Sequence, residues 1–186
     1  MAEESRKSVD EFFNKVLSVI GRTTEEQVAD LLKKSKQTIS VAESLTGGLI
    51  SSRLTSQPGS SDFFTGGIVC YSNRVKVMDL GIPAQLIAKE SPVSANVAIA
   101  LAEAIRKRFR TDIGLSATGV AGPGGTVPPK PIGLTYIALS SSDGTEWKEI
   151  TLQGGRNEIR EKAAQAALGL LWLHLGGKDV VSKLGL

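Results

Sequence analysis

Residues 38–56 read TISVAESLTGGLISSRLTS, and this run sets the expected fold class. Residues 38–42 have the short, apolar, β-prone composition of a buried strand. Residues 46–56 begin with Thr46, Gly47 and Gly48 and continue in a helical pattern. A strand that passes through small residues into a helix is typical of α/β proteins.

The same alternation of strands and helices continues along the rest of the chain. Further strands are predicted at residues 63–71, 113–117, 132–140 and 146–152, and the last two flank a Ser-Asp-Gly hairpin signal. Helices are predicted at residues 10–20, 24–34, 73–80, 94–109 and 157–174. Thr24 and Gln27 resemble a capping box, and Ser94 is the expected cap of the helix at residues 94–109. This order predicts an α/β three-layer sandwich with a mixed, mostly parallel sheet and helices on both faces.

The length of 186 residues corresponds to one domain. We expect a helical N-terminal extension at residues 1–36, the main domain at residues 37–175 and a flexible tail at residues 176–186. Residues 1–15 mix acidic and basic side chains and lack the apolar run of a secretory signal. Because no run of about 18 apolar residues occurs either, we expect a cytoplasmic protein without a membrane span.

The composition excludes several kinds of site. The single cysteine, Cys70, rules out an internal disulfide framework and a zinc site with several cysteines. The single histidine, His174, rules out metal sites that need two imidazoles. A net charge of +3 and an aromatic content of 5% give little support to nucleic-acid binding. We therefore expect no metal, no cofactor and no nucleic-acid partner.

Three segments rich in glycine or polar residues follow predicted strands, at residues 43–48, 71–76 and 118–125. Ligands of open α/β sheets bind at the carboxyl ends of the strands, so these segments are expected to form one pocket.

In the first segment, Ser44 lies between a strand and a helix, where it can project from the sheet edge. The amides at the start of the helix could stabilise a phosphate or a developing oxyanion, and Gly47 and Gly48 permit close approach of a ligand. The alternative is that Ser44 and Thr46 only cap the helix.

In the second segment, Ser72 or Asn73 is the expected N-cap of the next helix, which puts Lys76 near its first turn. The helix dipole and the exclusion of water would both lower the pKa of this lysine. A neutral lysine amine can accept the proton of a serine hydroxyl. The alternatives are a solvated Lys76 on the surface and a Tyr71 that serves only core packing.

The third segment, with Thr118, Gly119, Gly122 and Gly124, is predicted to be a loop whose amides are open to a ligand. The alternative is a plain connecting loop.

Arg156 and Arg160 open the last helix, where they either face solvent or reach a phosphate. His174 is expected at the end of that helix without a catalytic role, and Cys70 is expected in the core, with a place in the pocket as the alternative.

Taken together, these motifs resemble the CinA C-terminal domain family, whose stand-alone members are similar to nicotinamide-nucleotide amidases (PncC-like). The likeness rests on 41–48 (VAESLTGG), 71–76 (YSNRVK) and 118–125 (TGVAGPGG), in this order, within residues 31–175. It implies hydrolysis of the carboxamide of nicotinamide mononucleotide to nicotinic acid mononucleotide and ammonia. It further implies Ser44 as nucleophile, Lys76 as general base, Tyr71 as supporting hydroxyl, substrate or oxyanion contacts at Thr118 and Gly119, no metal, and a homo-oligomer.

Two departures from the family pattern matter. Leu45 replaces a frequent cysteine, and we expect its side chain to point into the core while Ser44 points outward. Residues 1–36 are too few for the larger N-terminal domain of many relatives, so activities tied to that domain, such as ADP-ribose pyrophosphatase activity, are not expected. Two alternatives remain, a non-catalytic nucleotide-binding accessory module and an amidase for a different carboxamide.

Overall fold

The computed structural model describes residues 23–124 and 130–177. Five strands form one sheet in the order β2-β1-β3-β4-β5. They are β1 (Ile39–Glu43), β2 (Phe64–Val69), β3 (Ile113–Gly119), β4 (Leu134–Ser141) and β5 (Gly144–Thr151). Strands β2, β1 and β3 are parallel, β4 is antiparallel to β3, and β5 is antiparallel to β4. Since every strand except β4 therefore runs in one direction, the predicted mixed, mostly parallel sheet is confirmed.

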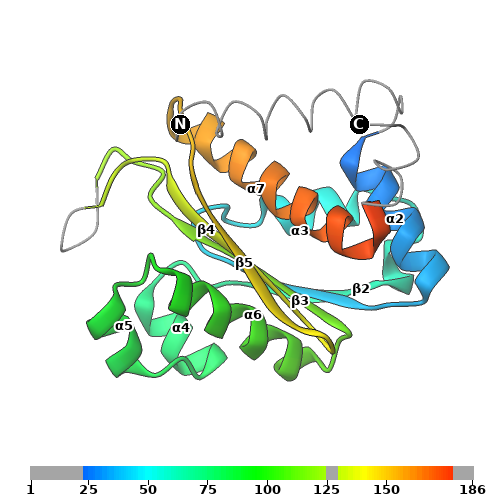
Figure 1. Ribbon diagram of the computed structural model, residues 1–186, viewed down its shortest axis with the longest axis horizontal. Coiled ribbons are helices and arrows are strands. Elements are labelled where there is room, and N and C mark those ends of the chain that lie inside the picture. The colour runs from blue at the N-terminus through cyan, green and yellow to red at the C-terminus, as the bar shows by residue number, and fades with distance from the viewer. Residues whose placement is uncertain (1–22, 125–129, 178–186) are drawn as a thin grey trace.

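Helices cover both faces of the sheet, as predicted (Figure 1). One face carries α2 (Thr24–Ser35), α3 (Leu49–Thr55) and α7 (Arg156–Trp172). The other carries α4 (Asn73–Leu80), α5 (Ala84–Glu90) and α6 (Ala95–Phe109). Short helical turns lie between α3 and β2, at Ser60–Asp62, and directly after α7, at Leu173–Gly177.

The sheet separates two apolar cores, and β1 contributes to both because its side chains alternate between the faces. Val41 and Leu45 belong to the core shared with α2, α3 and α7, whereas Ala42 packs into the core under α4, α5 and α6. All five residues of β1 are buried, as expected of a central parallel strand. The inward position expected for Leu45 is thus confirmed by its exposure of 4%.

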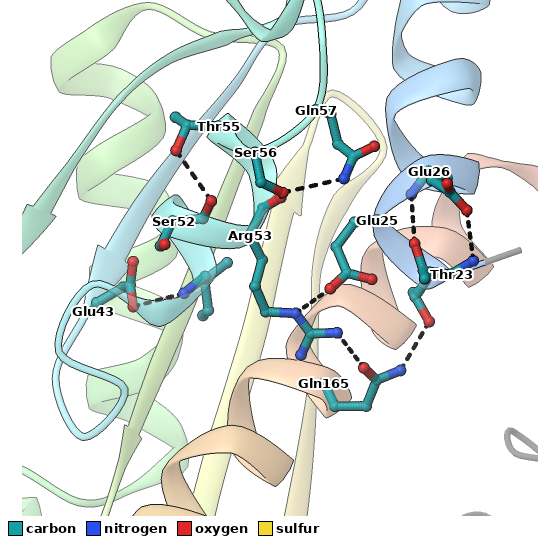
Figure 2. Close-up of polar contacts among 12 residues, drawn as sticks. Thr23, Glu25, Glu26, Glu43, Ser52, Arg53, Thr55, Ser56, Gln57 and Gln165 are labelled. Carbon is teal, nitrogen blue, oxygen red and sulfur yellow. Dashed lines mark hydrogen bonds and ion pairs between the residues drawn. The ribbon is translucent and has the colours of Figure 1, made fainter.

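Helix α2 is tied to α3 and α7 by a polar network that Figure 2 shows. Arg53 of α3 donates to Glu25 of α2 and to Gln165 of α7. The amide of Gln165 in turn donates to Thr24 Oγ1 at 2.8 Å. Val28 and Leu32 of α2 are fully buried in the core beside α7, so this helix is part of the core on that face of the sheet.

The structure corrects several local predictions. The capping box of α2 is Thr23 with Glu26, not Thr24 with Gln27. Helix α3, in contrast, begins at Leu49, directly after the two glycines as predicted, because Gly47 and Gly48 adopt positive φ angles of 60° and 102° that a helix does not allow. Helix α5 was not predicted at all. The helix expected at residues 10–20 and the tail from residue 178 lie outside the described residues.

Candidate active site

The carboxyl ends of β1, β2 and β3 meet at one cleft of about 190 Å³. Ser44 follows β1, while Tyr71, Asn73 and Lys76 follow β2. The structure brings these side chains together with the end of β3 and the loop beyond it. The cleft is also lined by Thr118, Gly119, Gly122, Gly124 and Arg156 from the sequence prediction, and by Leu45, Pro92, Val93, Val120 and Ala121.

Ser44 and Lys76 form a close pair at the bottom of this cleft. Lys76 Nζ lies 3.1 Å from Ser44 Oγ and donates to the carbonyl oxygen of Cys70 at 2.7 Å. Lys76 is 1% exposed and Ser44 is 9% exposed. The alternative of a solvated Lys76 is therefore wrong.

Burial lowers the pKa of Lys76 below its ordinary value of 10.5, because the ammonium form loses its hydration. A thiolate at Cys70 would oppose this effect on the pKa. Burial, however, raises the pKa of the Cys70 thiol, so that this side chain is uncharged near neutral pH. We conclude that the chemistry around Lys76 favours a neutral amine.

The backbone fixes both members of the pair. The Ser44 amide donates to Ala117 O of β3 at 2.9 Å, and the Cys70 amide donates to Glu43 O at 2.8 Å. Ser72 caps α4 by accepting from the Val75 amide at 3.3 Å, and Lys76 lies one helical turn further on. The neighbouring strand ends thus set where the hydroxyl and the amine meet.

The turn between Ser44 and α3 is held from two sides. Arg160 of α7 donates from Nε to Leu45 O at 3.2 Å and from Nη2 to Thr46 O at 3.1 Å. The Gly48 amide donates to the Glu43 carboxylate at 2.9 Å, so the oxyanion role expected around residues 46–48 is not open to that amide. Thr46 is fully buried, and its Oγ1 is the buried side-chain oxygen for which the described residues supply no hydrogen-bond partner.

Tyr71 lies at the mouth of the cleft and is 58% exposed, which contradicts the alternative of core packing. Its hydroxyl accepts from Arg156 Nη2 at 2.8 Å, and the same guanidinium donates to Gly122 O. Arg156 therefore links the tyrosine to the glycine-rich loop. At the end of β3, Thr118 Oγ1 donates to Pro92 O at 2.8 Å.

Other predicted residues lie outside the cleft lining. Thr46, Gly47, Gly48 and Ser72 shape the two turns behind it, with Ser72 as the helix cap. Cys70 is buried in the core under α6, as one alternative had it. His174 lies just after α7, with Nδ1 3.2 Å from Glu146 Oε1 of β5.

The walls that the sequence did not reveal come from the segment between α5 and α6. Pro92 and Val93 line the cleft, and their sequence neighbourhood contains no chemical signal beyond a proline in a loop. A larger groove of about 540 Å³ between α4 and α5 adjoins the cleft and shares Asn73 and Pro92 with it. Arg74, Val77, Met78 and Ile87 line this groove.

Within residues 23–124 and 130–177, no three side chains of His, Cys, Asp or Glu are grouped so that they could hold a metal ion. Over the same residues, no helix is both long and apolar enough to cross a membrane.

The chain is similar to several known proteins. It is 43% identical over 177 residues to a CinA-like protein of Dictyoglomus thermophilum, a match that covers 91% of this chain and 43% of that protein. It is 45% identical over 170 residues to a CinA-like protein of Acidobacterium capsulatum, covering 91% and 41% of the two chains. The chain thus spans less than half the length of these curated relatives.

Solved structures give the same result. A CinA superfamily protein from Enterobacter cloacae matches with a TM-score of 0.80 and 27% identity, over 82% of this chain and 90% of that one. A competence/damage inducible protein, CihA, from Agrobacterium tumefaciens matches with a TM-score of 0.75 and 33% identity, over 82% and 94% of the two chains. The family model of the CinA C-terminal domain matches residues 21–175. By this match and these relatives, the chain belongs to the CinA C-terminal domain family.

Proposed function

We propose that the protein is an amidohydrolase that converts nicotinamide mononucleotide to nicotinic acid mononucleotide and ammonia through an acyl-enzyme on Ser44. One observation carries the proposal, the 3.1 Å approach of a buried lysine amine to a serine hydroxyl inside a cleft. Ser-Lys pairs of this kind perform nucleophilic acyl transfer on unrelated folds. The substrate itself is taken from the resemblance to nicotinamide-nucleotide amidases.

The reaction needs one proton carrier. A neutral Lys76 amine has one lone pair, and while one N–H is donated to Cys70 O, the lone pair is free to accept the Ser44 proton. As the proton leaves, Ser44 Oγ attacks the carboxamide carbon, and the negative charge moves to the carbonyl oxygen. The Lys76 ammonium then gives its proton to the departing nitrogen, the C–N bond breaks, and ammonia leaves.

Water completes the cycle by the same route. It attacks the ester carbon, Lys76 accepts its proton, and the breakdown of the second tetrahedral intermediate returns a proton to Ser44 Oγ. The nucleotide carboxylate is released. Because the Gly48 amide is engaged by Glu43, donors nearer Ser44 or at the Gly119 end of β3 are the candidates for the oxyanion.

The rim of the cleft supplies candidates for recognition of the nucleotide. Tyr71 and Arg156 are joined by the 2.8 Å hydrogen bond, and Arg156 also reaches the loop at Gly122. A guanidinium in this position can bind a phosphate group that extends from the cleft. We assign the phosphate to Arg156 on this basis.

Catalysis explains the buried lysine better than a purely binding role does. Taking an amine out of water without a carboxylate partner costs free energy. A module that only binds a nucleotide gains nothing from a neutral amine beside a serine hydroxyl, whereas an acyl-transfer enzyme requires one.

The test is ammonia release from nicotinamide mononucleotide by the wild type, Ser44→Ala and Lys76→Ala. Each substitution should lower kcat by about 1000-fold or more, as losses of nucleophile or base do in serine hydrolases. Ser142→Ala is the matched control, because Ser142 is exposed in the β4–β5 turn. A folded Ser44→Ala protein with normal turnover would refute the proposal.

A further inference from the structure

Glu43, the residue before Ser44, is a fully buried acid that the reaction scheme does not use. Its Oε2 accepts from the amides of Gly48 at 2.9 Å and Ile50 at 3.1 Å. Its Oε1 accepts from the amide of Ser51 at 2.9 Å and from the Ser51 hydroxyl at 2.6 Å. Figure 2 shows the carboxylate directed at the start of α3. The ion pairs identified among the described residues do not include Glu43.

These four contacts close the chain between residues 43 and 51 into a loop that contains the nucleophile. Helix α3 has no cap of its own, since Gly48 at its N-cap position has no side chain to accept a hydrogen bond. The Glu43 carboxylate fills this role from the strand that precedes the turn. On the other side, the Ser44 amide is held by Ala117 O. The backbone of Ser44 is therefore fixed between β3 and the start of α3.

The same contacts decide which donors the substrate can meet. A strand-to-helix turn behind a nucleophile commonly offers helix-start amides to an oxyanion. Here three of those amides are engaged by a carboxylate in the interior. The positive end of α3 thus acts on Glu43 and serves the geometry of the turn.

We propose that Glu43 is a positioning residue, which holds the 44–48 turn so that Ser44 Oγ stays within reach of Lys76 Nζ for the acylation step. This inference rests on the proposed function, because it concerns the same hydroxyl and amine. Glu43 itself does not touch the substrate in this scheme. Its effect is on the rate of attack by Ser44.

Glu43→Gln is the informative substitution because it keeps the shape and removes one acceptor oxygen. If the amide oxygen keeps Gly48 and Ile50, the NH₂ group faces Ser51, whose hydroxyl can turn to accept but whose amide cannot. The turn must shift to relieve the two opposed donors. A displacement of about 1 Å at a reacting group lowers a rate about 100-fold.

Asp112→Asn is the matched control, because Asp112, just before β3, binds Thr38 at the opposite end of β1 from Glu43. The Asp112 carboxylate accepts from the Thr38 amide at 2.8 Å and from the Thr38 hydroxyl at 2.7 Å, just before β1. Its loss weakens the fold at β1 without touching the 44–48 turn. The control therefore separates general instability from the loss of catalytic geometry.

The experiment compares the wild type with both variants by three measurements. These are kcat and KM for nicotinamide mononucleotide, the rate of covalent labelling of Ser44 by a fluorophosphonate, and hydrogen exchange of the Gly48, Ile50 and Ser51 amides. Glu43→Gln should lower kcat and the labelling rate about 100-fold, change KM little and speed exchange of these amides. Asp112→Asn should keep the wild-type kcat. A folded Glu43→Gln protein with wild-type kcat and labelling overturns the proposal, as does an equal loss of kcat in Asp112→Asn.

Two further outcomes of the experiment also test the proposal. If Glu43→Gln does not fold, Ser51→Ala removes only the 2.6 Å hydroxyl contact, and a fall in kcat of about 3-fold to 10-fold supports the proposal while an unchanged kcat rejects it. If the wild type is labelled at Ser44 but releases no ammonia, the proposed function fails. The labelling rates of the wild type and Glu43→Gln then still test the positioning role of Glu43. If the wild type is not labelled either, both proposals fall.

Discussion

Replacing Lys76 with methionine tests the uncharged amine independently of any substrate. Methionine keeps an unbranched apolar stem and has no ionisable group. Because burial lowers the pKa of Lys76, the folded chain binds fewer protons than the unfolded chain at pH values between the folded-state pKa and about 10.4. The free energy of unfolding of the wild type should therefore rise, relative to Lys76→Met, by up to about 1.4 kcal/mol for each pH unit in this window.

The pH dependence is the test, since the difference in unfolding free energy between the wild type and Lys76→Met at a single pH combines opposing effects. The substitution removes the 2.7 Å bond to Cys70 O, and a buried acceptor left unsatisfied costs about 1–3 kcal/mol. It also removes an amine whose burial is unfavourable. Below the folded-state pKa both effects are independent of pH, and they set only the offset between the two proteins.

The assay is urea-induced unfolding of both proteins at closely spaced values between about pH 6 and about pH 10. The difference should move in favour of the wild type as the pH rises through this range, by up to about 3–6 °C in Tm per pH unit if followed by thermal melting. Lys89→Met is the control, because the Lys89 side chain is 82% exposed, and its difference should stay flat. A constant difference for Lys76→Met, or one that moves in favour of the variant, would show that Lys76 is charged in the folded protein.

Three other predictions concern the rim, the turn and the mechanism. Arg156→Ala should lower kcat/KM about 10-fold to 100-fold for nicotinamide mononucleotide and much less for the riboside that lacks phosphate; the same selectivity in Arg74→Ala instead would place the phosphate in the α4–α5 groove. Thr46→Val should raise Tm by about 2–4 °C or more, because it removes a buried hydroxyl to which the described residues offer no hydrogen-bond partner; an unchanged or lower Tm would contradict this reasoning. A chelator should leave ammonia release unchanged, and a loss restored by a divalent metal would contradict a reaction carried by Ser44 and Lys76 alone.

The convergence of the three motifs could be predicted because it follows from topology. Parallel strands end at the same edge of a sheet, so residues after β1, β2 and β3 had to approach one another. Lys76 as a base followed from the scarcity of histidine. Its burial could not be predicted, because the segment at residues 71–76 looks equally suited to a solvated surface helix until the packing of α4 is known.

The capping box of α2 shows how a local prediction can fail by one residue. Thr23 with Glu26 and Thr24 with Gln27 both fit the pattern of a capping box. In the structure the pair with the acidic residue is formed, and a carboxylate is also the better partner for the positive end of a helix. The charge of the third helical residue was the signal that distinguished the two registers.

The sequence contains an indirect signal for the role of Glu43, the lack of a capping side chain at the start of the next helix. The helix that starts near residue 49 has glycine before it and no acidic residue in its first turn, so its free amides needed an acceptor from elsewhere. Pro92 and Val93, in contrast, carry no such signal. They lie beside the end of β3, where Thr118 Oγ1 donates to Pro92 O and Val93 packs against Val120.

The alternation of side chains along one strand explains why two buried ionisable groups coexist next to Ser44. Val41, Glu43 and Leu45 point to the face of the sheet that carries α3 and α7, whereas Ala42 and Ser44 point to the face that carries α4. Glu43 is thereby satisfied by backbone amides of α3, and Lys76 meets only a carbonyl and a hydroxyl. If both side chains shared one face, an ion pair would raise the pKa of Lys76 and keep the amine charged. The position of the acid directly before the nucleophile therefore matters for the chemistry. Because side chains alternate between the two faces of a strand, the Glu43 carboxylate can hold the turn without stabilising the ammonium form of Lys76.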